Sequence, residues 1–147
     1  MVDKYDTRYL ELAKHISTWS KDPSTRVGAI AIGDKGQVLA QGYNGFPRGV
    51  KDSDERYDDK EVKYRYVVHA EMNCIYNAGY NGASLDGAEL YVYGLPVCND
   101  CAKGIIQVGI IRVISPKNGI DIGEKWKVSC LSTVSMFEEV GIKYDFV

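Results

Sequence analysis

The chain has 147 residues, enough for one domain with a single hydrophobic core. Hydrophobic residues make up 45% and charged residues 26%, as in ordinary globular proteins, so we expect residues 1–147 to form one domain. The net charge of −2 gives no support for binding a nucleic acid polymer. The polar N-terminus does not resemble a signal peptide, so we expect a cytoplasmic protein with reduced thiols. No apolar run is long enough to span a bilayer, so we expect no membrane partner.

The first half of the chain predicts one helix followed by a hairpin. Apolar residues at helical spacing indicate a helix from Thr7 to Trp19. Two short apolar runs, Val27 to Ile32 and Val38 to Tyr43, flank a turn signal at Asp34-Lys35-Gly36 and predict antiparallel strands. The highly charged stretch from Lys51 to Tyr66 is expected to be a solvated surface loop, with a lid over a pocket as the alternative.

The second half alternates helix and strand signals. The expected helices are His69 to Ala78, ended by Gly79, Cys98 to Val108, ended by Gly109, and Val128 to Val140, ended by Gly141. The expected strands are Ala88 to Tyr93, Ile110 to Ile114 and Ile142 to Val147, with a loop from Lys117 to Lys127. A hairpin followed by βαβ units implies an α/β fold, a three-layer α/β/α sandwich with a five-stranded mixed sheet.

One motif pair carries candidate chemistry. His69 and the cysteines of Cys98-Asn99-Asp100-Cys101 are three ligands of the kind that zinc prefers, and three ligands leave the fourth zinc position open for water. Zinc lowers the pKa of such a water towards about 7. Glu71 follows His69 by two residues and would reach the same region from the first helical turn, as an oxygen base beside the metal. Each motif is expected at the start of a helix that follows a strand, so the sequence predicts a catalytic zinc site.

Two alternatives for these motifs remain open. The zinc could be structural and not served by Glu71, or Cys98 and Cys101 could be a thiol pair without metal. A second metal site that joins His15 to Cys74 or Cys130 is also conceivable. We favour an ordinary helix histidine at position 15, because no ligand cluster surrounds it.

Several motifs together identify a family. An H-x-E triplet followed by P-C-x-x-C is the signature of zinc nucleobase deaminases, although here Val97 separates Pro96 from the first cysteine. The chain further contains Pro23-Ser24-Thr25-Arg26-Val27-Gly28-Ala29, Gly42-Tyr43-Asn44-Gly45-Phe46-Pro47-Arg48-Gly49, His69-Ala70-Glu71-Met72-Asn73 and Cys98-Asn99-Asp100-Cys101-Ala102-Lys103. With these residues the chain resembles the deoxycytidylate (dCMP) deaminases of the cytidine deaminase-like superfamily. Its closing residues, Trp126 and Met136-Phe137-Glu138-Glu139-Val140-Gly141, resemble the bacterial and phage branch.

This resemblance implies an enzyme that hydrolyses dCMP to dUMP and ammonia and supplies dUMP for thymidylate synthesis. It implies one catalytic Zn²⁺ per chain held by His69, Cys98 and Cys101, with Glu71 as proton shuttle. It also implies that the deoxycytidine nucleotide is bound by Ser24, Thr25, Arg26, Asn44 and Ala70.

The resemblance further implies regulation and assembly. Family members are activated by dCTP and inhibited by dTTP with Mg²⁺, and the expected regulatory nucleotide site comprises Gly42, Tyr43, Asn44, Gly45, Phe46 and Arg48. A homo-oligomer is expected, with a hexamer favoured. The rival functions are deamination of dCTP or another cytosine nucleoside or nucleotide, deamination of another amino-bearing ring, and a non-catalytic zinc-binding module.

Overall fold

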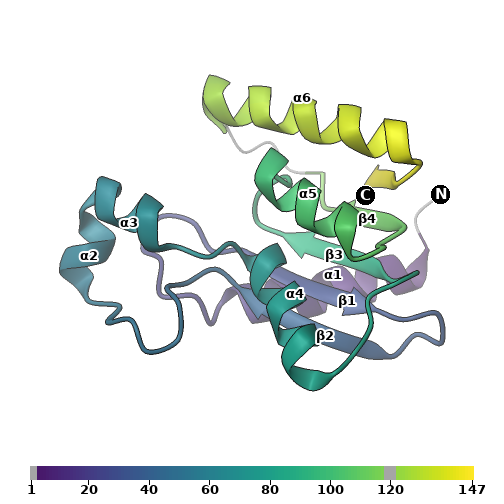
Figure 1. Ribbon diagram of the computed structural model, residues 1–147, viewed down its shortest axis with the longest axis horizontal. Helices are drawn as coiled ribbons and strands as arrows, with labels where there is room; N and C mark the ends of the chain where they lie inside the picture. The colour runs from purple at the N-terminus through teal and green to yellow at the C-terminus, as the bar shows by residue number, and fades with distance from the viewer. Residues whose placement is uncertain (1–2, 118–121) are drawn as a thin grey trace.

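The computed structural model describes residues 3–117 and 122–147 (Figure 1). Its strands are β1 (Gly28–Ile32), β2 (Val38–Tyr43), β3 (Glu89–Tyr93), β4 (Arg112–Ser115) and β5 (Lys143–Phe146). Its helices are α1 (Lys4–Ser17), α2 (Asp54–Asp58), α3 (Lys60–Tyr66), α4 (Ala70–Asn81), α5 (Asn99–Gln107) and α6 (Gly123–Val140). Within these two ranges, no helix combines the length and the apolar character needed to cross a bilayer.

The five strands form one mixed sheet in the order β2-β1-β3-β4-β5. β1 pairs antiparallel with both β2 and β3, whereas β3, β4 and β5 run parallel. Parallel neighbours require a crossover, and α5 and α6 lie on the two crossovers, from β3 to β4 and from β4 to β5. The predicted turn closes the β1–β2 hairpin, where the backbone N–H of Gly33 donates to the carbonyl of Gln37 at 2.8 Å.

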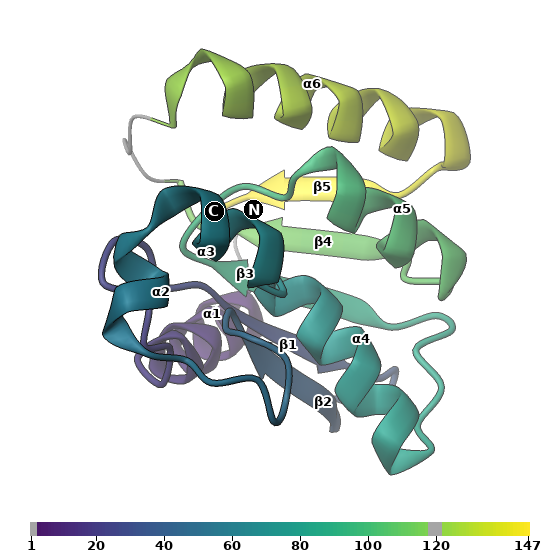
Figure 2. The same ribbon diagram turned by 60° about the vertical axis from the view of Figure 1, so that its left-hand side comes forward.

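Helices cover both faces of the sheet (Figure 2). Successive residues of a strand point to opposite faces, and β1 shows this alternation. Ile30 and Ile32 pack in a buried cluster with α1, whereas Ala29 and Ala31 belong to a larger cluster that includes residues of α4, α5 and α6. The predicted three-layer α/β/α sandwich with a five-stranded mixed sheet is therefore confirmed.

The charged stretch from 51 to 66 is not a loop, so this prediction is wrong. It contains α2 and α3, whose N-cap residues Ser53 and Asp59 each accept hydrogen bonds from backbone N–H groups of the first turn. Tyr57 is buried and stacks on the ring of Phe46, with centroids 4.4 Å apart. Caps and one aromatic anchor thus organise a segment that lacks the apolar periodicity of a typical core helix.

Several helix boundaries also differ from the prediction. The helix expected from Thr7 to Trp19 runs from Lys4 to Ser17, because the side chain of Asp3 caps it by accepting from the backbone N–H of Tyr5. The helix that was expected to end at Gly79 continues to Asn81 and ends at Gly82, which has a φ of 70°. The loop expected over 117–127 falls partly on residues 118–121, outside the described residues, and its last part is helical because α6 begins at Gly123. Gly141, with a φ of 82°, ends α6 as predicted.

Candidate metal and catalytic site

The two predicted motifs lie at the N-termini of α4 and α5. His69 is the N-cap of α4 and Cys98 is the N-cap of α5, both with extended backbones. Val68 and Gly45 exchange two backbone hydrogen bonds of 2.7 and 3.1 Å, which fix the approach to His69. Gly94 follows β3 with a φ of 123°, and a Cβ there would lie 2.6 Å from a backbone oxygen of the neighbouring loop. Glycine therefore lets the chain turn from β3 towards α5.

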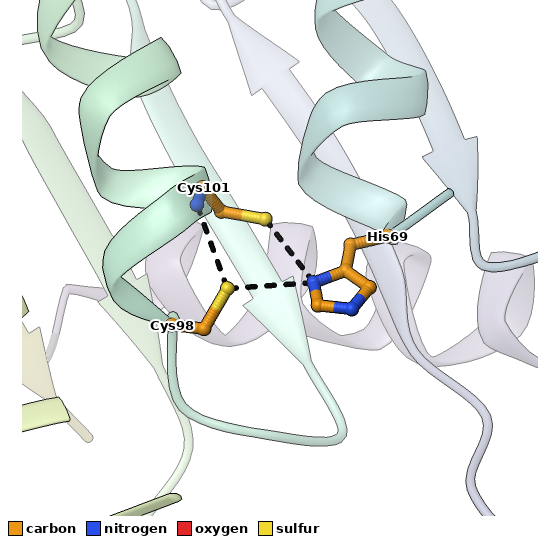
Figure 3. A group of neighbouring side chains, drawn as sticks. All are labelled: His69, Cys98 and Cys101. Atoms are coloured by element: carbon orange, nitrogen blue, oxygen red, sulfur yellow. Dashed lines mark hydrogen bonds between the residues drawn. The ribbon is translucent and has the colours of Figure 1, made fainter. Parts of the chain in front are cut away.

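The three predicted metal ligands converge on one point (Figure 3). His69 Nδ1 lies 3.4 Å from Cys98 Sγ and 3.3 Å from Cys101 Sγ. The three ligand atoms all lie within 4.8 Å of one another. In a tetrahedral zinc site with ordinary bond lengths, neighbouring nitrogen and sulfur ligands are about 3.6 Å apart. The residues therefore fit a zinc ion, and a group of three ligands leaves one coordination position for another molecule.

Hydrogen bonds within the cluster favour one thiolate, that of Cys98. The pKa of Cys98 lies well below its ordinary value because its sulfur accepts a hydrogen bond from Cys101 and a further one from His69. The same hydrogen bond, together with burial, raises the pKa of Cys101. The hydrogen bond to Cys98 also raises the pKa of His69. Thiolate is the form of cysteine that binds metal, so the first ionisation of the thiol pair already prepares the site.

Glu71 places a buried carboxyl group near the metal-ligand group. It lies in the first turn of α4 and its exposed fraction is only 4%. Burial raises the pKa of Glu71 to about 7, while the nearby charge of His69 acts in the opposite direction. A carboxyl group with a pKa near 7 both accepts and donates a proton at neutral pH.

The predicted substrate residues Ser24, Thr25 and Arg26 lie on a turn organised by Asp22. Asp22 Oδ1 accepts hydrogen bonds from the backbone N–H groups of Ser24 (2.8 Å) and Thr25 (3.1 Å) and from Lys63 Nζ (3.0 Å). Arg26 is exposed, and its Nε donates to the carbonyl of Asp22 at 3.4 Å. Sequence analysis missed Asp22 and Lys63. An aspartate before Pro-Ser is a recognisable turn signal, whereas nothing links Lys63 to a residue 41 positions away.

Asn44 is joined to this turn. Its Oδ1 accepts from the backbone N–H of Val27 at 2.8 Å, and its Nδ2 donates to the carbonyl of Thr25 at 2.9 Å and to Asp22 Oδ2 at 3.5 Å. Asn44 is buried, with an exposed fraction of 7%. The structure thus brings four of the five predicted substrate residues together, namely Ser24, Thr25, Arg26 and Asn44. The fifth, Ala70, begins α4 directly after His69 and is fully buried.

The predicted regulatory residues lie at the end of β2 and in the segment that joins β2 to α2. Gly42 packs against α4, where a Cβ would lie 2.3 Å from the backbone nitrogen of Cys74, so the close strand–helix contact requires glycine. Phe46 stacks on Tyr57, and Tyr43 lies edge-on to the ring of Trp19 with centroids 6.2 Å apart. These contacts account for several of the motif residues through packing.

Arg48 lies apart from the other predicted regulatory residues. Its guanidinium donates to Asn77 Oδ1 and lies 5.2 Å from the centroid of the Tyr80 ring. All three residues line an open groove of about 610 Å³ between β2 and α4, which Gly42, Tyr43, Asn44, Gly45 and Phe46 do not line. Arg48 is therefore the one predicted regulatory residue that the structure brings to this groove.

A smaller cavity of about 210 Å³ borders the turn that carries Cys98. It is lined by Gly94, Leu95, Pro96, Ser115, Pro116, Lys117 and Phe146. These residues lie at and beyond the carboxyl ends of β3, β4 and β5, where ligands usually bind in open α/β sheets. Sequence analysis did not select them, although their positions after predicted strands could have indicated the cavity.

The alternative of a second metal site finds no support in the described residues. The group able to share a metal there does not include His15, Cys74 or Cys130. The His15 ring instead lies edge-on to Trp19, with centroids 5.9 Å apart. Cys74 is buried, which raises the pKa of its thiol to about 12. This agrees with the preferred interpretation of His15 as an ordinary helix residue.

A three-ligand metal group and a buried carboxyl at two helix N-termini are the parts of a hydrolytic metal site in an α/β/α fold. The family model described as "Cytidine and deoxycytidylate deaminase zinc-binding region" matches residues 3–116. A protein of Aliivibrio fischeri named "Uncharacterized deaminase in luxG 3'region" is 36% identical over 143 residues, 97% of this chain and 93% of its own length. The chain belongs to the cytidine and deoxycytidylate deaminase family.

Two further similarities concern proteins that are named as deoxycytidylate (dCMP) deaminases. The deoxycytidylate deaminase of Mus musculus is 44% identical over 100 residues, which cover 65% of this chain. The chain spans about half, 54%, of that curated relative. The structure of the dCMP deaminase from the cyanophage S-TIM5 in complex with dCMP and dUMP has a TM-score of 0.75 and covers 100% of this chain and 99% of its own. At 23% identity, this likeness concerns the fold.

Proposed function

We propose that this chain hydrolyses dCMP to dUMP and ammonia, with one zinc ion held by His69, Cys98 and Cys101. The observation that carries the proposal is the convergence of these three ligand atoms beside the buried carboxyl of Glu71. The choice of dCMP is supported by the names of the relatives, including a mouse deoxycytidylate deaminase and a cyanophage enzyme with bound dCMP and dUMP. We further propose that residues 1–147 act as one domain.

Glu71 performs the proton transfers. When bound, zinc supplies a Lewis acid that lowers the pKa of water and so makes a nucleophile available near neutral pH. The carboxylate of Glu71 accepts a proton from the attacking water and delivers it to N3 of the cytosine ring. Glu71 then takes the remaining proton from the oxygen added at C4 and passes it to the amino group, so that the C4–N bond breaks, C4 becomes a carbonyl carbon and ammonia leaves. A pKa near 7 suits both directions of transfer.

The remaining proposed site residues bind the nucleotide. The exposed guanidinium of Arg26 suits the phosphate, since its planar fork matches phosphate oxygens bidentately. Ser24 and Thr25 lie on the same turn, and Asn44 and Ala70 complete the proposed subsite. The Asn44 Nδ2 group already donates to Thr25 and Asp22, and its Oδ1 already accepts from Val27, so we expect it to accept from the deoxyribose hydroxyl with the second lone pair of Oδ1.

The proposal extends to regulation and assembly. Activation by dCTP and inhibition by dTTP, with Mg²⁺ as companion of the triphosphate, would use Arg48 in its groove and the segment Gly42–Phe46 next to it. A homo-oligomer, with a hexamer favoured, a cytoplasmic location and a role in supplying dUMP for thymidylate synthesis complete the proposal.

One experiment tests the activity. Zinc content is measured on the purified chain, followed by ammonia release from cytidine, CMP, dCMP and dCTP, each with and without dCTP or dTTP as effector. We expect about one zinc per chain and fastest turnover of dCMP. Cys98→Ser should lose zinc and turnover, whereas Cys130→Ser, which changes a half-buried thiol outside the ligand group, should keep both.

The other outcomes separate the rival functions. Preference for dCTP would keep the chemistry but overturn the proposed monophosphate substrate. Turnover unaffected by either effector would overturn the regulatory proposal only. Zinc bound without turnover of any of the four substrates would contradict the deaminase proposal for cytosine compounds and favour another ring or a binding module.

A further inference from the structure

The residue before the first cysteine ligand is held by the C-terminal part of the chain. The N–H of Val97 donates to Tyr144 Oη at 3.0 Å, and its carbonyl accepts from Thr133 Oγ1 at 2.9 Å. Val97 and Thr133 both have an exposed fraction of 0%. Thr133 lies in α6 and Tyr144 in β5, so two separate elements fix both backbone polar groups of one residue in the ligand turn.

Pro96 and Asn99, on either side of Val97 and Cys98, are also held by side chains of α6. Trp126 Nε1 donates to the carbonyl of Pro96 at 3.1 Å. The N–H of Asn99 donates to Ser129 Oγ at 2.8 Å, and this hydroxyl donates in turn to Asn99 Oδ1 at 2.6 Å. The Trp126 ring also lies 6.0 Å from the His69 ring, between centroids. α6 therefore contacts both the cysteine turn and the histidine ligand.

We propose that Trp126, Ser129, Thr133 and Tyr144 are positioning residues of the metal site. They hold the turn 96–99 so that Cys98 Sγ stands opposite His69 Nδ1 before metal binds. The inference rests on the zinc site of the proposed function, and it assigns a role to residues that lie beyond the family match at 3–116. Hydrogen bonds in the outer shell orient metal ligands, and their loss typically lowers metal affinity 10- to 100-fold.

A purely structural role makes a different prediction. If α6 served only to cover the sheet, removal of the Thr133 hydroxyl would lower the melting temperature and leave the zinc affinity of the folded protein unchanged. If Thr133 positions the ligand turn, the carbonyl of Val97 loses its donor in a fully buried place, the turn gains freedom, and zinc affinity falls.

The test measures zinc affinity of the full chain by competition with a chelator of known affinity, together with thermal unfolding. Thr133→Val should weaken zinc binding by about 10- to 100-fold, and Thr133→Ser, which keeps the hydroxyl, should restore it. Ser132→Ala is the matched control, because Ser132 is exposed and its hydroxyl bonds only a carbonyl of its own helix in the described structure. It should bind zinc like the wild type.

A second variant keeps the inference testable if Thr133→Val does not fold. Trp126→Phe removes the donor to Pro96 at a half-buried site and should also weaken zinc binding. Wild-type zinc affinity in a folded Thr133→Val or Trp126→Phe variant would overturn the inference. Because the readout is zinc affinity, a wild-type chain that binds zinc but does not convert dCMP would contradict the proposed function and leave this inference to be decided by the variants.

Discussion

Two clusters of polar groups lie on opposite faces of the sheet, and they differ in whether every polar group has a partner within the chain. On the α1 side, Arg112 pairs with Asp6 (2.9 Å), Glu89 (2.7 Å) and Asp145 (2.8 Å), while the Tyr91 hydroxyl donates to Asp6. Every charge in that cluster has a partner supplied by the chain. On the other side, the three ligand atoms of the metal group face one another across a space that fits an ion.

This difference indicates that the fully paired cluster stabilises the fold, whereas the ligand cluster serves metal binding and catalysis. In a cluster whose charges are all paired, no charged group remains to bind a ligand. Removing one partner leaves the opposite charge buried without compensation. The ligand cluster instead keeps one coordination position open and places Glu71, a buried carboxyl with a raised pKa, beside it. The contrast predicts that variants of the first cluster change the free energy of unfolding, and that variants of the second change turnover.

The largest effect is expected from Glu71→Gln. Removing the proton shuttle should lower kcat for dCMP by a factor of about 10² to 10⁴ while the zinc content stays near that of the wild type. Zinc analysis and steady-state ammonia release measure both quantities. Glu11→Gln, on the exposed face of α1, is the control and should be neutral. Near-normal turnover of Glu71→Gln would show that another group carries the proton.

Arg112→Met breaks the fully paired cluster. Asp6 is buried and would lose its cation, so the free energy of unfolding should fall by about 3 kcal/mol, the low end for a buried pair because Glu89 and Asp145 remain partly exposed. Chemical denaturation measures the loss. Arg65→Met, at an exposed ion pair with Glu61, should change the stability by less than about 0.5 kcal/mol. A strong loss of zinc affinity in folded Arg112→Met would contradict the separation of the two clusters.

Most of the sheet and all three metal ligands were predictable from the sequence. The hairpin joins two short apolar runs through a recognisable turn, and β2 has the predicted bounds, Val38–Tyr43. The pairing of His69 with Cys98 and Cys101 followed from motif spacing and metal chemistry. The signals that predicted the strands and the two ligand motifs are local, because each lies within the segment that it predicts.

The rest depends on contacts between distant residues. α2 and α3 have caps but little apolar periodicity, so their helical state depends on packing such as that of Tyr57 on Phe46. In α6 the apolar stripe predicts burial of Leu131, yet Leu131 is 70% exposed and Thr133 is fully buried. The partner of Thr133 is the carbonyl of Val97, 36 positions away, which no periodicity reveals.

Lys63→Met tests a further polar cluster, formed by Asp22, Lys63 and the N–H groups of Ser24 and Thr25, which is fully paired but lies at the proposed substrate turn. Asp22 would lose its buried ammonium partner but keep the N–H groups of Ser24 and Thr25, so the stability should fall by about 2 kcal/mol. If that turn binds dCMP, KM should rise while zinc content is unchanged. Lys21→Met, at an exposed ion pair, is the control. An unchanged KM in the folded variant would argue against substrate contact through this turn.

The smallest expected effect is the dependence on pH of the stabilisation that Asp6 provides. Hydrogen bonding from Arg112 lowers the pKa of Asp6 below its ordinary value of 3.8, against the opposing effect of burial. The unfolded chain therefore binds this proton first as the pH falls, and the stabilisation by Asp6 is present above its ordinary pKa and lost as the pH drops through the lowered one. Asp6→Asn should cost about 1.5 kcal/mol at pH 7.

The difference in stability between the wild type and Asp6→Asn should stay constant above about pH 5 and shrink below it. Denaturant unfolding at a series of pH values from neutral to acid measures this convergence. Asp3→Asn is a poor control because Asp3 caps α1, whereas Asp34→Asn, in the exposed hairpin turn, should run parallel to the wild type. If the difference in free energy of unfolding between the wild type and Asp6→Asn stayed constant down to the most acid pH, Asp6 would act through hydrogen bonds alone. The fully paired cluster would then stabilise the fold through hydrogen bonding and packing rather than through paired charges.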